Sequence, residues 1–187
     1  TNTSSVEAFR KALVNKDILL ITEPSSASAS VFTTLAPAMQ EFAGRGGRIV
    51  FCGTSNSACV FNTGLFSGNY VGSTSASLTV VDAGHSFTTG LPPSFNGPGN
   101  NYVYNFTDSD FVRLVNAATG MISGYRRFGS GLVAYIGFDF YNINANAARL
   151  LTNLITAPYA TYGNISSGKL VVPASSTGSV QLNFEGN

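Results

Sequence analysis

The chain has 187 residues, of which 44% are hydrophobic and only 10% are charged, and its formal net charge is +1. This length and hydrophobic content predict a folded domain with a full core and exclude a disordered chain. No basic cluster occurs beyond the two adjacent pairs Arg10-Lys11 and Arg126-Arg127, and no apolar run approaches about 20 residues, so we expect neither a nucleic-acid partner nor a membrane span.

The first predicted elements form a βαβ unit. After a short helix over 4–14, the apolar run 17–24 is typical of a strand buried on both faces of a parallel sheet. A helix over 28–47 and a second buried strand over 48–53 follow, and the crossover between the two strands should be right-handed. Pro37 is expected to kink the helix or to mark its start. Four apolar residues at helical spacing form the helix face that packs on the sheet: Val31, Leu35, Met39 and Phe42.

The second half of the chain mixes β-rich and α/β patterns. Residues 60–130 are rich in Gly, Asn and Ser and contain several short strand-like pieces, which predicts a β-rich insertion. Residues 131–140 form a strongly apolar strand, and 144–155 form an amphipathic helix. From residue 158 the pattern alternates apolar and polar residues around a turn at 175–178, as in a β-hairpin tail.

Cys52 and Cys59 leave three interpretations open. Cys52 ends a buried strand and precedes Gly53, so it is a candidate nucleophile on a strand-to-helix turn. A Cys52–Cys59 disulfide would close a short loop in an oxidising compartment, and a small core residue is the third alternative. The spacing of the two cysteines and the single, distant His85 do not fit a zinc site, so we expect no metal and no cofactor.

Three further groups are candidates for binding or catalysis. His85 could act as a base toward Cys52, although an imidazole bonded to the local backbone is favoured. The aromatic residues Tyr102, Tyr104 and Phe106, with Phe111, could form a sugar platform, but alternating aromatics more often line a half-buried strand. A short ladder of oxygen side chains lacks the bidentate glutamate typical of calcium loops: Asn105, Asp108 and Asp110.

The order of several motifs resembles the class I glutamine amidotransferase-like superfamily, including its trehalose-utilisation-like branch. The resemblance is carried by the strands 17–24 and 48–53, by "GHSFTTGLP" at 84–92, and by "GSGLVAYIGFDFYN" at 129–142 with the following helix. It covers about residues 5–157 and implies a flavodoxin-like three-layer α/β/α sandwich with a mostly parallel sheet. We therefore divide the chain into an α/β domain, 1–157, and a β-patterned tail, 158–187.

The resemblance also implies where catalytic residues would stand. Active members carry a cysteine on the turn and a His-x-Glu pair at the end of a later strand. Cys52 matches the cysteine, but Asp139 and Tyr141 stand at the histidine and glutamate positions, and Val50 and Thr54 flank the turn where small residues are expected. A carboxylate near a thiol raises the thiol pKa and suppresses the nucleophilic thiolate. We expect Asp139 to have a structural role instead, bonding backbone amides or capping the helix near Asn144.

These observations favour a non-catalytic structural or interaction domain over two alternatives, a cysteine-dependent hydrolase or amidotransferase and a carbohydrate-binding module. Because Ser, Thr, Asn and Gly replace most charged residues, we expect a secreted or cell-surface bacterial protein. The partner would be protein, either a further copy or a neighbouring domain. The chain begins with a helix where a flavodoxin-like sheet begins with a strand, which predicts an exposed sheet edge. The tail, 168–187, is expected to open a β-sandwich or to add strands to a neighbouring copy, and the alternative is that it lies along an edge of its own sheet.

Overall fold

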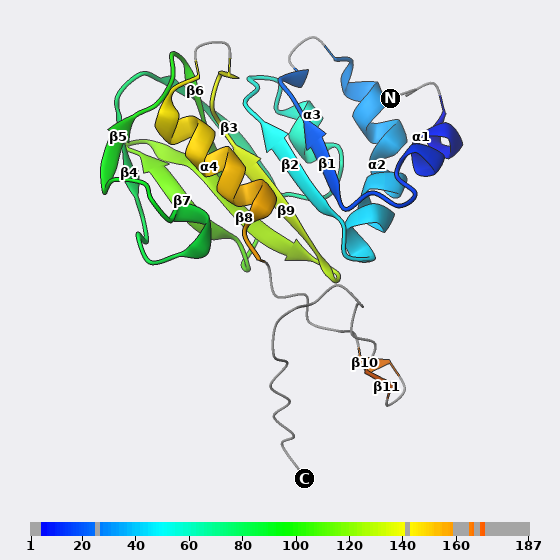
Figure 1. Ribbon diagram of the computed structural model, residues 1–187. Helices are drawn as coiled ribbons and strands as arrows, with labels where there is room; N and C mark the ends of the chain where they lie inside the picture. Colours follow the sequence, from blue (N-terminus) through cyan, green and yellow to red (C-terminus); the bar gives the residue numbers. More distant parts are fainter. Residues whose placement is uncertain (1–4, 25–26, 141–142, 159–164, 167–168, 171–187) are drawn as a thin grey trace.

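The computed structural model describes residues 5–24, 27–140 and 143–158, together with two short strands, 165–166 and 169–170. Within these ranges the fold is mixed α/β: an open sheet lies between helices (Figure 1). The described helices are α1 (Val6–Ala12), α2 (Ala29–Gly44), α3 (Ala58–Phe61), the 3₁₀ turn η2 (Ser86–Thr88) and α4 (Ala145–Thr156). None of them is long and apolar enough to cross a bilayer.

Among the described residues the sheet has nine strands, and only two of its eight strand pairings are parallel. The expectation of a mostly parallel sheet is therefore wrong, because the β-rich insertion adds antiparallel strands. The main strand path runs β1-β2-β9-β8-β7-β4-β5, and β6 joins β8 while carrying β3 on its other side. The parallel strands are β1 (Ile18–Ile21), β2 (Arg48–Cys52) and β9 (Gly131–Ile136), and the pairing of β8 with β9 is antiparallel. The remaining strands are β3 (Gly68–Thr74), β4 (Ser77–Val80), β5 (Ser94–Asn96), β6 (Asn101–Phe106), β7 (Val112–Ala117) and β8 (Gly120–Phe128). The expected β-rich insertion therefore extends one continuous sheet.

Two hydrophobic cores lie on opposite faces of this sheet. Along β2, Ile49 and Phe51 belong to the core beneath α2, whereas Val50 and Cys52 belong to the core beneath α4. β9 alternates in the same way. Because successive side chains of a strand point to opposite faces, both strands are buried on both sides. This burial on both sides explains why the sequences of β2 and β9 are continuous apolar runs.

β1 differs from the expectation of a strand buried on both faces. Within the described part of the chain it is a border strand that pairs only with β2, and Ile18 and Leu20 are 36% and 39% exposed. Leu19 and Ile21 pack against the core beneath α2, so the opposite face of β1 is the uncovered one. The apolar sequence of β1 predicts a strand correctly, but it does not predict that this strand lies at the border of the sheet.

The helices expected over 4–14, 28–47 and 144–155 are confirmed, each with ends within three residues of the expected bounds. Ser5 caps α1 by accepting from the Ala8 amide at 3.1 Å, and α2 continues through Pro37 without interruption. Pro37 therefore neither starts nor ends the helix. In the tail, Ile165–Ser166 (β10) pairs antiparallel with Lys169–Leu170 (β11), and the predicted hairpin around 175–178 lies outside the described residues.

Arg48 connects the start of β2 to the end of α4. Its guanidinium donates to the carbonyls of Leu154 and Ile155, both at 2.6 Å, and of Ala157 at 3.0 Å. It also lies 5.8 Å from the centre of the Phe87 ring. A cation at the carboxyl end of a helix is stabilising because the last carbonyls have no partner within the helix.

We expect Arg48→Ala to lower the free energy of unfolding by about 2–3 kcal/mol, because charged hydrogen bonds to several helix carbonyls are lost. Urea unfolding would measure the change. The matched control is Arg10→Ala, which breaks an exposed pair with Glu41 and should cost less than about 1 kcal/mol. Equal effects of the two substitutions would contradict this role of Arg48.

Candidate functional site

The candidate site lies at the carboxyl edge of the three parallel strands. Glu23 follows β1, Cys52 ends β2, and Asp139 follows β9. Cys52 is in register with Ile136 of β9, so the ends of these two strands lie side by side. Parallel strands bring their carboxyl ends to one edge, where ligand sites of open α/β sheets are found.

Cys52 is buried and protonated. Its side chain is 1% exposed and belongs to the core beneath α4. Burial, and secondarily the carboxylate of Glu23, raises the pKa of the Cys52 thiol to about 12. A nucleophilic cysteine needs the opposite shift, because only the thiolate attacks.

The turn after Cys52 is closed by its neighbours. Gly53 lies against the carbonyl of Phe138 and the ring of Tyr102, and a Cβ at this position would overlap both. In a nucleophile elbow, the backbone after the nucleophile faces the substrate. Here that space is filled by the end of β9 and by a tyrosine of β6.

Glu23 holds the ends of β1 and β9 together. Its carboxylate accepts from the Phe140 amide at 2.7 Å, and its backbone has a φ of +36°, which is strained for a residue with a side chain. No motif in the sequence marks Glu23 as a site residue, and the available signal is a glutamate before proline at the end of an apolar run.

Asp139 does not cap α4. The cap is Asn144, whose side chain accepts from the Ala147 amide at 3.0 Å. The Asp139 amide donates to the Asn100 carbonyl at 3.2 Å, and the Asp139 carboxylate contributes, after burial, to the raised pKa of Tyr102. Tyr141 lies outside the described residues. Asp139 thus contributes negative charge at the carboxyl edge, where the resemblance would require an imidazole.

His85 is engaged away from Cys52. Its Nδ1 accepts from the Phe87 amide at 3.1 Å, and its Nε2 lies 2.9 Å from the Tyr125 hydroxyl. The favoured interpretation, an imidazole bonded to its local turn, agrees with these contacts. Because both ring nitrogens have partners, His85 has no nitrogen left to activate a thiol in this arrangement.

Cys59 is a second buried thiol and not half of a disulfide in this structure. Both cysteines are free, and the Cys59 thiol donates to the Pro24 carbonyl at 3.4 Å. Burial raises its pKa as well. Cys59 thereby ties α3 to the segment after β1, and the cysteines match the third interpretation, small core residues.

The aromatic residues of β6 are interior. Tyr104 is fully buried, Phe106 is 6% exposed, and the Tyr104 hydroxyl donates to the Thr54 carbonyl at 2.8 Å. The two rings stack with centroids 5.7 Å apart, and only Tyr102 is partly exposed. A sugar platform needs accessible ring faces, so Tyr104 and Phe106 do not form one in this structure.

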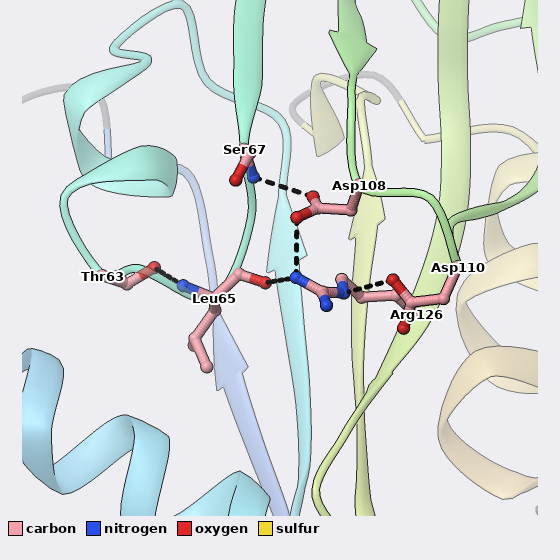
Figure 2. Close-up of polar contacts among 6 residues, drawn as sticks. All are labelled: Thr63, Leu65, Ser67, Asp108, Asp110 and Arg126. Atoms are coloured by element: carbon pink, nitrogen blue, oxygen red, sulfur yellow. Dashed lines mark hydrogen bonds and ion pairs between the residues drawn. The ribbon is translucent and has the colours of Figure 1, made fainter.

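Asp108 and Asp110 bind an arginine instead of a metal ion. Figure 2 shows Arg126 of β8 between them: Nη1 lies 2.7 Å from Asp108 and Nε lies 3.0 Å from Asp110. The other oxygen of Asp108 accepts from the Ser67 amide at 2.8 Å. Among the described residues, no cluster of three metal-ligating side chains occurs. Arg126, Asp108 and Asp110, here called the Arg126 cluster, join β8 to the start of β3. The sequence did not reveal this contact because Arg126 is 18 residues from Asp108.

Comparison with known proteins finds likeness in structure only. No family model matches the chain, and no curated protein matches it. A protein from Bacteroides uniformis described as ThuA-like superposes with a TM-score of 0.56 at 15% identity, covering 83% of this chain and 73% of its own. A protein from Thermoplasma acidophilum, described as a GMP synthase subunit, superposes with a TM-score of 0.55 at 11% identity. The match covers 78% of this chain and 74% of that protein. At these identities the likeness shows the fold alone.

Two further comparisons correct or extend the sequence analysis. A protein from Salmonella typhimurium, described as cytoplasmic, superposes with a TM-score of 0.59 at 11% identity over 82% of this chain and 74% of its own. A second one is described in the same way, so the expectation of a secreted protein is contradicted. A β-galactosidase from Rahnella superposes with a TM-score of 0.51 at 12% identity. The match covers 74% of this chain but only 22% of the enzyme.

We expect Asp108→Ala to destabilise the fold by about 3 kcal/mol, because it leaves the guanidinium of Arg126 and the Ser67 amide without this partner. Asp110→Ala removes a carboxylate that is 46% exposed and should cost less than about 1 kcal/mol. Chemical unfolding of both variants measures the difference, and similar losses would rule out this division of roles.

The buried Cys52 thiol also predicts a pH dependence. Its pKa is about 12 when folded against 9.0 for a model thiol, so folding stability is complete below pH 9 and is lost as pH rises toward 12. The Cys52 contribution lost by pH 10 should be about 1.4 kcal/mol.

Cys52→Ala should therefore lose less stability than the natural chain between pH 8 and pH 10. Val50→Ala, a buried change on the same strand, is the matched control and should lower stability equally at both pH values. Urea unfolding at the two pH values measures both effects. Parallel pH profiles for the natural chain and Cys52→Ala would show that the thiol is not the group responsible.

Proposed function

We propose that this chain is a non-catalytic structural or interaction domain with a flavodoxin-like arrangement, related to the class I glutamine amidotransferase-like superfamily. The observation that carries the proposal is the state of Cys52. It occupies the nucleophile-like position, yet it is 1% exposed and the pKa of its thiol is raised to about 12. A nucleophile that is both inaccessible and protonated does not attack an amide at neutral pH.

Three further observations support the proposal. Asp139 stands where the resemblance places the base, His85 is bonded elsewhere, and the backbone after Cys52 faces Phe138 and Tyr102. The likeness to the ThuA-like and GMP synthase-related proteins is a likeness of fold, which unrelated functions share. In the β-galactosidase from Rahnella the matched region is 22% of a larger chain, which supports the use of this fold as one module of a protein.

We expect neither Cys52 nor Cys59 to react with iodoacetamide in the folded protein at pH 8, because both thiols are buried and protonated. Peptide mapping by mass spectrometry after timed labelling measures each site separately. In 6 M guanidinium chloride both should be labelled completely.

Ser55→Cys is the matched control for this experiment, because position 55 is exposed and lies in the same turn. This introduced thiol should be labelled within minutes while Cys52 stays intact. Rapid labelling of Cys52 in the folded chain, with an apparent pKa below 8.5, would overturn the proposal in favour of a cysteine-dependent enzyme.

A further inference from the structure

The free edge of β1 is the least protected border of the sheet. Natural edge strands are shielded by charged side chains, proline, bulges or short length, because unpaired backbone groups invite another strand. β5 has three residues between Pro93 and Gly97-Pro98, and the pairing of β3 shifts register between Tyr70 and Gly72. β1 is also short, but its four residues are all apolar, contain no charge or proline, and pair with β2 without a bulge.

The exposed apolar residues of β1 define one face of this edge. Ile18 and Leu20 are 36% and 39% exposed, on the face that α4 leaves uncovered, whereas Leu19 and Ile21 contact the core beneath α2. In Figure 1, β1 borders the sheet beside α2, and α4 crosses the sheet farther along. An added strand with apolar residues on the α4 face would cover Ile18 and Leu20 and supply the missing hydrogen bonds.

The described chain leaves the α/β layer next to this edge. Arg48 binds the carbonyls of Leu154, Ile155 and Ala157, and Arg48 is in register with Ile18 at the start of β1. Ala157 is therefore separated from the amino end of β1 by the length of the Arg48 side chain and one strand spacing of about 4.8 Å. A segment that enters from this end would run parallel to β1, β2 and β9.

The later sequence contains a segment that fits this edge. Residues 179–184, "SVQLNF", lie outside the described residues and alternate apolar with polar side chains, without charge or proline. Their apolar members are Val180, Leu182 and Phe184. The residues between 158 and 179 include the β10–β11 hairpin, and the 14 residues outside that hairpin can extend up to about 46 Å. Four paired residues are too few for a stable interface between separate copies of β1, whereas a tethered strand gains from high effective concentration.

We propose that residues 179–184 add to the free edge of β1 as a further parallel strand, with Val180, Leu182 and Phe184 over Ile18 and Leu20. The inference rests on the proposed function and deepens it, because it names the interaction surface and its occupant. The donor segment comes from the same copy, because the tether gives it a high effective concentration at this edge.

Amide hydrogen exchange of the full chain tests the proposal. The β1 amides that point away from β2 should exchange at least tenfold faster in Leu20→Lys and in Leu182→Lys than in the natural chain, because each substitution places a charge in the apolar contact. Two matched controls should leave these amides protected. Val112→Lys changes a residue of similar exposure, 38%, on a strand with neighbours on both sides. Gln181→Lys places the same charge on the opposite side of the donor segment.

The outcomes separate the possible occupants. Protection with a monomeric mass supports pairing within one copy, whereas a dimer abolished by Leu182→Lys would indicate exchange between copies and contradict the proposal. Outward β1 amides that exchange rapidly in the natural chain would overturn the proposal. So would protection that survives Leu182→Lys and disappears on dilution, which would indicate β1 pairing with β1 of a second copy. Because Cys52 labelling is measured separately, failure here leaves the proposed function standing, and reactivity of Cys52 leaves the β1 result standing.

Discussion

The burial of β2 and β9 on both faces is the constraint on which the rest of the structure depends. Their alternating side chains enter two separate cores, one beneath α2 and one beneath α4. Since the two strands are parallel, their carboxyl ends meet at one edge and bring Cys52, Gly53 and Asp139 together. The same packing desolvates Cys52, so the position that resembles a nucleophile is part of the hydrophobic core.

Negative charge at the carboxyl edge raises the pKa of the Cys52 thiol, as burial does. Glu23 accepts a hydrogen bond from Phe140 and thereby fastens β1 to β9, and its carboxylate further raises the pKa of the Cys52 thiol. A catalytic cysteine site would instead place a cation or an imidazole near the sulfur. The edge has therefore become a structural junction, in which the strained backbone of Glu23 is maintained by the contacts of its side chain.

The β-rich half enlarges the sheet and changes how its borders are protected. The Arg126 cluster holds β8 against the loop before β3, and β5 ends one border as a three-residue strand between prolines. At the opposite end of the main strand path, β1 has no strand on its outer side among the described residues, and Ile18 and Leu20 are exposed there. This asymmetry distinguishes a border shaped to stay free from one suited to receive a further strand.

The sequence by itself determined the elements with strong local patterns. Hydrophobic periodicity located β1, α2, β2, β9 and α4, and the absence of an imidazole or glutamate after β9 already argued against a cysteine nucleophile. Only the tertiary structure decided how these elements meet. Continuous apolar runs look alike in border and central strands, so β1 was misplaced. Arg126, Glu23 and Asn144 find their roles through contacts or caps that depend on chain path, and the raised thiol pKa of Cys52 comes from desolvation by residues distant in sequence, which periodicity does not encode.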